Sequence, residues 1–223
     1  MLLTENNYQK KRYYENLFYL TCDTNRIGKL LTHYELLKKT EHLPGIVAEF
    51  GVFKGASFVR LAMMRELLGI TFAKKVLGFD VFGKFPPPDY ENDKARRDEF
   101  ILSAGDESIS REELMSILKR KGITLDIELI KGDILKTLPE YLAQNPETKF
   151  SFINLDTDIY EPAKCILENC WPRLVKGGIL LLDDYTFFAG ENKAVDDYFS
   201  DKNVEIKVYP YAKSPCYIEK KYL

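Results

Sequence analysis

The sequence has no long hydrophobic run and few cysteines. None of the apolar stretches in its 223 residues approaches the ~20 residues that cross a bilayer. The opening MLLTENNYQKKRYY turns polar after three residues, unlike a secretory signal. The cysteines, Cys22, Cys165, Cys170 and Cys216, form no C-x-x-C pair, which favours reduced thiols over a zinc site. We therefore expect a cytoplasmic protein that contacts no membrane.

The chain also lacks an excess of charge of one sign. Lys and Arg total 32 and Asp and Glu total 34, which gives a net charge of -2. No basic stripe could follow a phosphate backbone, so we expect no nucleic-acid partner. With 45% hydrophobic and 13% aromatic residues, the chain can form one large domain with a substantial core.

From about residue 45, short apolar runs alternate with segments of helical periodicity, a pattern typical of β-α-β units. We predict an α/β, Rossmann-like fold whose seven-stranded, mostly parallel sheet has helices on both faces. The predicted strands are 46–51, 76–81, 126–130, 150–155, 179–182, 205–211 and 216–219. The last two are separated by Ala-Lys-Ser-Pro and would form a C-terminal antiparallel hairpin.

Helices are predicted between the strands at 57–68, 111–121 and 161–174. Ser110, followed three residues later by Glu113, is a capping box for the second of these helices.

Two segments lie outside this alternation. Residues 1–44, with helices predicted at 8–20 and 27–39, are expected to form an N-terminal helical cap on the active edge of a domain at 45–223. Segment 82–105 contains three consecutive prolines and many charges, so it cannot continue the sheet. A long loop in a compact domain is often functional, and we interpret this one as a substrate lid.

The first strand runs into EFGVFKGAS, residues Glu49 to Ser57, where Gly51 and Gly55 allow a tight turn before a helix. The spacing is not the G-x-G-x-x-G of a dinucleotide site. Because the strand ends on a carboxylate, it suits a cationic ligand such as a sulfonium better than a pyrophosphate.

The next two strands also end in acidic residues. Asp80 closes the second strand, where a carboxylate can accept hydrogen bonds from ribose hydroxyls. Gly132 and Asp133 follow the third strand, where a carboxylate can accept the amino proton of adenine. The carboxyl ends of parallel strands meet at one edge, so these residues predict a nucleoside-binding site.

A cluster of carboxylates follows the fourth and fifth strands. Asp156 begins the motif DTDIYEP, and Asp183 and Asp184 follow the strand LLL. Hard oxygen ligands from adjacent strand ends are the arrangement that Mg²⁺ prefers, so Asp156, Asp183 and Asp184 are our predicted metal ligands. The alternative is that Asp158 or Asp184 points to solvent and Asp183 caps a turn.

These motifs together resemble the macrocin O-methyltransferase (TylF/MycF-like) family of class I S-adenosylmethionine-dependent methyltransferases. The resemblance covers residues 44–185 and is most specific in EFGVFKGAS, FDVFGKFPP, KTLPEYL, LDTDIYEP and KGGILLLDDY. It implies Mg²⁺-dependent methyl transfer from S-adenosylmethionine to a sugar hydroxyl, such as that of a deoxyhexose. Glu49, Gly51, Gly55 and Ser57 would then surround the methionine and ribose of the cofactor, and Asp80 would hold the ribose.

A hydroxyl acceptor must lose a proton, and Asp156 is our predicted base, with Asp158 in reserve. The chain has only two histidines, His33 and His42. Either could reach the site if the N-terminal cap folds over it, but we expect packing or surface roles for both. Ile159 stands where related catechol methyltransferases often carry a lysine, which favours a sugar over a catechol.

Three alternatives to this function stay open: a non-sugar hydroxyl such as a catechol, a dinucleotide-dependent oxidoreductase, and a binding protein without turnover. The sequence also leaves the oligomeric state open, a homo-oligomer included.

Overall fold

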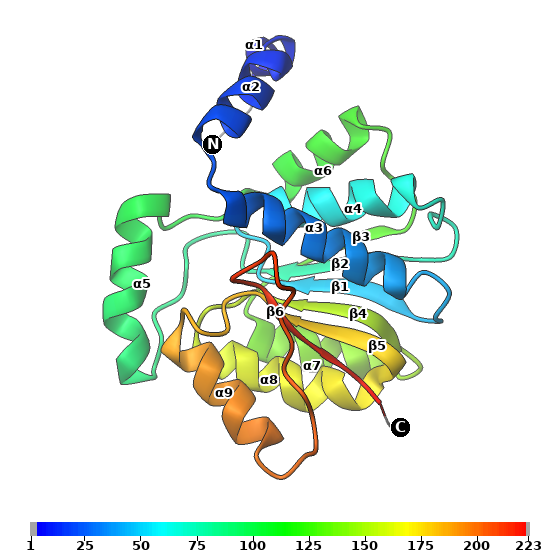
Figure 1. Cartoon of the computed structure of the whole chain (residues 1–223), viewed down its shortest axis with the longest axis vertical. Coiled ribbons are helices and arrows are strands. Elements are labelled where there is room, and N and C mark those ends of the chain that lie inside the picture. The colour runs from blue at the N-terminus through cyan, green and yellow to red at the C-terminus, as the bar shows by residue number, and fades with distance from the viewer. Residues whose placement is uncertain (1–3, 222–223) are drawn as a thin grey trace.

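A computed structural model describes residues 4–221 of the chain and contains one six-stranded sheet in the order β3-β2-β1-β4-β5-β6 (Figure 1). The strands are β1 Ile46–Phe50, β2 Val76–Asp80, β3 Ile127–Lys131, β4 Phe150–Leu155, β5 Leu174–Leu182 and β6 Cys216–Glu219. The first five are parallel, and β6 pairs antiparallel with β5. The predicted Rossmann-like α/β fold is confirmed.

The predicted seventh strand at 205–211 is wrong. This segment meets β6 only through a single bridge, in which Lys207 and Tyr217 exchange two backbone hydrogen bonds. Pro210 has no N–H to donate to a ladder, and the Tyr209 and Tyr211 rings stack on each other at 5.1 Å instead. Residues of high strand propensity therefore form an extended connection at the edge of the sheet.

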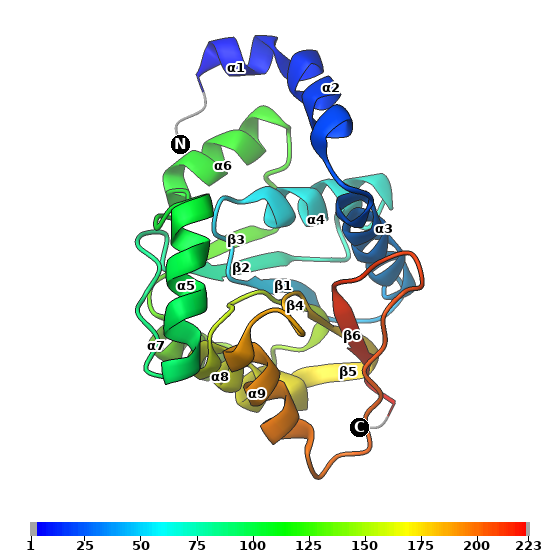
Figure 2. The same ribbon diagram turned by 60° about the vertical axis from the view of Figure 1, so that its left-hand side comes forward.

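Helices cover both faces of the sheet (Figures 1 and 2). One face carries α3 Thr24–Lys39, α4 Ala56–Leu67 and α6 Arg111–Arg120; the other carries α7 Ile134–Gln144, α8 Tyr160–Cys170 and α9 Ala189–Phe199. Each layer encloses its own apolar core. Strands β2 and β4 are buried along their whole length, which explains their nearly continuous apolar sequences.

The predicted helices at 57–68, 111–121 and 161–174 correspond to α4, α6 and α8. The last ends earlier than predicted because a 3-10 turn, Trp171–Arg173, leads directly into β5. Among the described residues, no helix is long and apolar enough to span a bilayer.

The N-terminal segment consists of α1 Glu5–Gln9, α2 Lys11–Thr21 and α3. Helix α3 packs against α4 and buries Leu36 and Leu37 in the core. Helices α1 and α2 bury none of their residues and extend away from the sheet as an arm (Figure 2).

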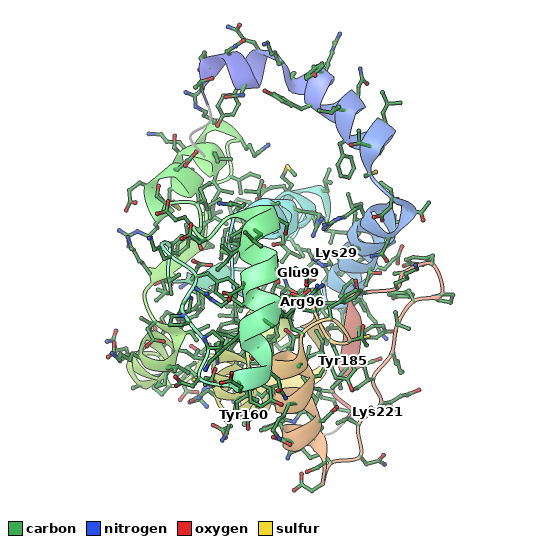
Figure 3. All side chains as sticks on the ribbon, turned by 90° about the vertical axis from the view of Figure 1, so that its left-hand side faces the viewer. Lys29, Arg96, Glu99, Tyr160, Tyr185 and Lys221 are labelled. Atoms are coloured by element: carbon green, nitrogen blue, oxygen red, sulfur yellow. The ribbon has the colours of Figure 1, made fainter. Side chains whose placement is uncertain are left out.

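The predicted lid segment contains helix α5 Glu91–Ala104, which stands in front of the carboxyl edge of the sheet (Figure 3). Asp93, fully buried, anchors this helix by accepting hydrogen bonds from the backbone N–H of Tyr160 and of Gly190, at the starts of α8 and α9. A Cβ on Gly190 would lie 1.9 Å from Asp93 Oδ2, so only glycine fits there. Helix α5 is thus docked on the domain.

Candidate active site

A cavity of about 580 Å³ opens at the carboxyl ends of the strands. Its walls come from the turns that follow β1 to β5, from α5 and from α3. Parallel strands place their carboxyl ends on one edge, so segments far apart in sequence meet there. All the site residues predicted from the sequence line this cavity except Glu49 and Gly55, which lie behind its wall.

Asp80 holds two turns of the cavity wall in place, one after β1 and one after β2. Its Oδ2 accepts hydrogen bonds from the N–H of Val52 and of Phe53, both at 2.8 Å, and its Oδ1 accepts one from Phe82 at 2.6 Å. Phe53 and Phe82 have φ values of 47° and 45°, rare for aromatic residues. Asp80 therefore stabilises strained backbone at the site.

Gly51, with a φ of 90°, lies where β1 ends against β4. A Cβ there would lie 1.6 Å from the carbonyl oxygen of Asp156, so the backbone itself requires glycine. Gly51 is thus needed in this motif because the backbones at the ends of β1 and β4 lie in close contact.

Glu49 is fully buried and accepts a hydrogen bond from Ser57 through Oε1, whereas Oε2 has no hydrogen-bond partner among the described residues. Burial raises its pKa to about 8, because water no longer stabilises the charge. A cation nearby would favour ionisation of this carboxyl group.

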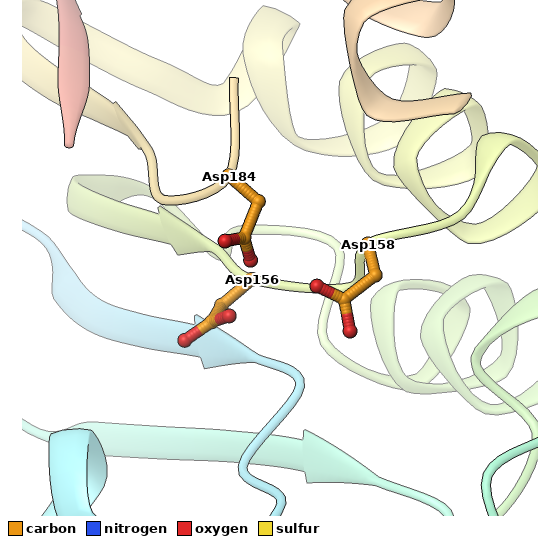
Figure 4. Close-up of side chains that lie close together, drawn as sticks. All are labelled: Asp156, Asp158 and Asp184. Carbon is orange, nitrogen blue, oxygen red and sulfur yellow. The ribbon is translucent and has the colours of Figure 1, made fainter. Parts of the chain in front are cut away.

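The carboxylates after β4 and β5 converge as expected. Asp156, Asp158 and Asp184 each offer an oxygen, and these atoms lie within 4.8 Å of one another (Figure 4). Asp158 has a φ of 64°, in the left-handed region that aspartate tolerates better than most residues. This conformation belongs to the turn that returns the Asp158 carboxyl group toward the other two.

Asp183, a predicted ligand, lies beside this cluster and contacts helix α3. Its Oδ2 accepts a hydrogen bond from Lys29 Nζ, and its Oδ1 lies 3.4 Å from His33 Nε2. The other ring nitrogen of His33 is 3.2 Å from an Arg60 guanidinium nitrogen. Because guanidinium can only donate, His33 Nδ1 is the acceptor and Nε2 carries the proton that faces Asp183.

Burial and neighbouring charge move the pKa values of these carboxyl groups in opposite directions. Burial, with the charges of Asp183 and Asp184, raises the pKa of Asp156 well above its usual range, and burial raises that of Asp158 to about 7. Burial also opposes ionisation of Asp183, but Lys29 and His33 outweigh it and hold its pKa below the usual range. The site therefore contains carboxyl groups that take up protons beside one that stays ionised.

The sequence profile of the macrocin-O-methyltransferases (TylF) matches residues 18–216. This chain belongs to that family. An 8-demethyl-8-(2,3-dimethoxy-alpha-L-rhamnosyl)-tetracenomycin-C 4'-O-methyltransferase of Streptomyces olivaceus is 30% identical over 158 residues, which are 70% of this chain. The match spans 58% of that relative's length.

Solved structures agree on the fold of this TylF family member. A crystal structure of CalS11, a calicheamicin methyltransferase, covers 98% of this chain and 94% of its own, with a TM-score of 0.76 and 23% identity. The apo structure of CalS11, described as a TDP-rhamnose 3'-O-methyltransferase, covers 92% and 84% with a TM-score of 0.68 and 25% identity. The predicted family is confirmed.

The individual roles predicted for the nucleoside residues stay predictions. Asp133 caps α7 by accepting a hydrogen bond from the N–H of Leu135 at 3.0 Å, and Gly132 and Asp133 both reach the cavity. Gly55, the residue that precedes α4, has a φ of 82°. A Cβ on Gly55 would lie 3.0 Å from a methyl carbon of Leu114. Ser57 lies between the cavity and Glu49.

Sequence reasoning missed three charged residues of the site: Lys29 on α3, Arg60 on α4 and Glu191 on α9. It named His33 on α3 but expected a packing or surface role for it. Lys29 and His33 are four residues apart, which places them on one helical face, and this spacing was the available signal. Glu191 is fully buried and accepts a hydrogen bond from the N–H of Asp184 at 3.2 Å, a contact that no sequence pattern indicates.

Proposed function

We propose that this TylF family member transfers a methyl group from S-adenosylmethionine to a hydroxyl of a sugar with the help of Mg²⁺. One observation supports this most: carboxyl groups from two strand ends converge on a cavity that is also lined by most of the predicted cofactor residues. A cavity of about 580 Å³ falls within the usual range for small-molecule sites.

The residues present fit a cationic nucleoside cofactor. Gly51, Asp80 and Asp133 line one part of the cavity, and Glu49 Oε2 is a buried oxygen without a hydrogen-bond partner among the described residues. When bound, S-adenosylmethionine supplies a methyl group on a positively charged sulfur, already activated for transfer. A positive charge near Glu49 would lower its raised pKa and so be stabilised by the ionised carboxylate.

The residues also fit a hard divalent cation. Asp156 and Asp184 belong both to the ligands predicted from sequence and to the cluster in the structure. We propose Asp158 as the third ligand because its carboxyl group lies in the same cluster, whereas Asp183, the third ligand predicted from sequence, is engaged by Lys29. The cation would acidify an alcohol, whose pKa resembles the ~15.7 of water, and orient it in the cavity.

The chain supplies the proton acceptor. We assign Asp156 this role because it lines the cavity at the end of β4, within the acidic cluster, and because burial and nearby negative charge raise its pKa and so its basicity. With S-adenosylmethionine bound, Asp156 would accept the proton that the hydroxyl group loses as its oxygen takes the methyl group from sulfur.

A deoxyhexose is our proposed acceptor. The Streptomyces olivaceus relative is named for a rhamnosyl product, and CalS11 is described as acting on TDP-rhamnose. The absence of a lysine at Ile159 agrees with a sugar rather than a catechol.

Isothermal titration calorimetry with S-adenosylhomocysteine tests the proposal at its first step. We expect binding by the folded protein, weakened by Asp80→Ala, because that change releases both strained turns of the cofactor wall. Failure of the folded wild-type protein to bind would reject the function.

A further inference from the structure

Glu191 connects the two turns that carry the acidic cluster of Asp156, Asp158 and Asp184. It lies in the first turn of α9 and is fully buried. Its backbone N–H donates a hydrogen bond to the carbonyl oxygen of Asp158 at 3.3 Å, and its Oε1 accepts one from the N–H of Asp184 at 3.2 Å. One residue therefore links the turn that follows β4 to the turn that follows β5.

The regular sheet does not hold these turns by itself. The ladder between β4 and β5 ends at the pair of Leu155 and Leu182, before any residue of the acidic cluster. Beyond it, Asp158 and Thr186 have φ values of 64° and 86°, in the region that residues other than glycine rarely adopt. Such backbone persists only where surrounding contacts hold it, and the two hydrogen bonds of Glu191 are contacts of this kind.

The preceding residue, Gly190, joins this connection to the lid segment. Helix α5 lies beside α9 (Figure 3). Asp93 of α5 accepts a hydrogen bond from the N–H of Gly190 at 2.7 Å and another from the N–H of Tyr160 at 3.0 Å. Because Tyr160 follows Asp158 by two residues, the Asp93 side chain holds both the start of α9 and the chain just after Asp158.

The Oε2 atom of Glu191 has no hydrogen-bond partner among the described residues. A buried oxygen without a partner lowers the stability of a folded protein. Stability alone therefore does not account for a glutamate at this position, whereas its two contacts with the ligand-bearing turns point to the acidic cluster.

We propose that Glu191 is a positioning residue for the acidic cluster, and that through Gly190 it couples the docking of α5 to the binding of the cation. The inference rests on the proposed Mg²⁺ site but not on the identity of the acceptor. Mg²⁺ demands nearly ideal octahedral geometry at about 2.0–2.1 Å, so its ligands must be held closely in place. Loss of a residue that orients the ligands usually lowers metal affinity by about 10–100-fold.

The coupling acts in both directions. If docked α5 stabilises the arrangement that binds the cation, the bound cation stabilises docked α5 by the same factor. Couplings of this kind usually lie between about 5-fold and 150-fold. The wall that α5 contributes to the cavity, which includes Phe100 and Ala104, is therefore stabilised when the cation is bound.

Calorimetric titration of the full chain with Mn²⁺ tests the positioning role. We expect Glu191→Ala to weaken Mn²⁺ binding by about tenfold or more. Glu191→Gln keeps an oxygen that can accept the hydrogen bond from the N–H of Asp184, so it should restore most of the affinity. Asp93→Ala, which changes no proposed ligand, should weaken binding by about fivefold or more. The matched control Asp98→Ala, on the same helix with a side chain 73% exposed, should bind as the wild type does.

Limited proteolysis with and without Mn²⁺ tests the opposite direction. Saturating Mn²⁺ should slow cleavage within α5 of the wild type by about fivefold or more, since cleavage follows the population of undocked helix. This protection should disappear in Glu191→Ala. Circular dichroism checks the folding of each variant, and if Glu191→Ala does not fold, Asp93→Ala decides the test.

Three results would each overturn the inference: unchanged Mn²⁺ affinity in folded Glu191→Ala or in Asp93→Ala, equal weakening by Glu191→Gln and Glu191→Ala, or cleavage of α5 that Mn²⁺ does not slow. The proposed methyl transfer would survive all three. A wild type that binds no Mn²⁺ would instead remove the metal from the proposed function and the inference with it.

Discussion

Burial raises the pKa of Asp158 to about 7 and that of Glu49 to about 8, so both carboxyl groups change charge near neutral pH. The carboxyl oxygens of Asp156, Asp158 and Asp184 lie within 4.8 Å of one another, so all three cannot carry a negative charge there at low cost. A cation at this cluster would therefore compete with protons, and one near Glu49 would favour its ionised form.

The acidic cluster predicts how metal affinity depends on pH. Metal ligands must be deprotonated, so Mn²⁺ affinity of the wild type should fall as pH decreases through about 7. We expect Asp158→Asn to weaken Mn²⁺ binding by at least about tenfold at pH 8, measured by calorimetry.

The variant Asp183→Asn, measured in the same way, distinguishes the cluster of Asp156, Asp158 and Asp184 from the ligands predicted from sequence, Asp156, Asp183 and Asp184. If Asp183→Asn removes binding while Asp158→Asn leaves it unchanged, the ligands are Asp156, Asp183 and Asp184, as the sequence predicts. Circular dichroism of each variant checks that it remains folded, since Asp183 also holds Lys29.

The raised pKa of Glu49 predicts that the free energy of unfolding depends on pH. Its folded pKa is raised above the usual 4.5, so the folded state binds its proton more tightly than the unfolded state does. The stabilising effect is complete below pH 4.5 and is lost as pH rises through about 8, on the order of 5 kcal/mol in all.

Glu49→Gln cannot titrate, and its amide oxygen can still accept the hydrogen bond from Ser57. Urea unfolding across the titration range, roughly pH 5 to pH 8, should show a smaller loss of stability in the variant than in the wild type. Parallel curves for the two proteins would contradict the raised pKa.

At the scale of elements, the parallel strands were predictable because strands buried on both faces read as continuous apolar runs. Helices α5, α7 and α9 were not predicted as helices. Helix α5 follows three prolines, α7 contains Pro139, and α9 is rich in charge, so the local sequence pattern predicts each of these helices only weakly. Tertiary contacts such as those of Asp93 stabilise α5 instead.

We therefore predict that the stability of the lid segment depends on Asp93. Asp93→Ala leaves the backbone N–H groups of Tyr160 and Gly190 without their acceptor, which should cost about 1–3 kcal/mol in urea unfolding. Limited proteolysis should also cut within α5 faster than in the wild type.

The matched control Asp98→Ala lies on the same helix, and Asp98 is 73% exposed at its side chain. It should change neither stability nor cleavage. Equal cleavage of Asp93→Ala and wild type would show that α5 does not depend on this anchor.

At the scale of the whole molecule, the sequence predicted the sheet edge that bears the site, because carboxyl ends of parallel strands always meet. It predicted a helix at 27–39 in a cap on this edge, but it could not predict the contacts of that helix, since nothing in the order of residues shows that Lys29 and His33 approach Asp183, 150 positions later or more. The prediction of a seventh strand was wrong for a related reason. The strand propensity of residues 205–211 does not show whether another strand is available to pair with them.

The central claim is methyl transfer to a sugar hydroxyl, and mass spectrometry with methyl-deuterated S-adenosylmethionine and TDP-rhamnose tests it most directly. We predict a product carrying one labelled methyl group in the presence of Mg²⁺, with a rate at least about a hundredfold lower in Asp156→Asn, whose side chain cannot accept the proton. Wild-type protein that binds S-adenosylhomocysteine but leaves TDP-rhamnose and other deoxyhexose acceptors unlabelled would contradict the account.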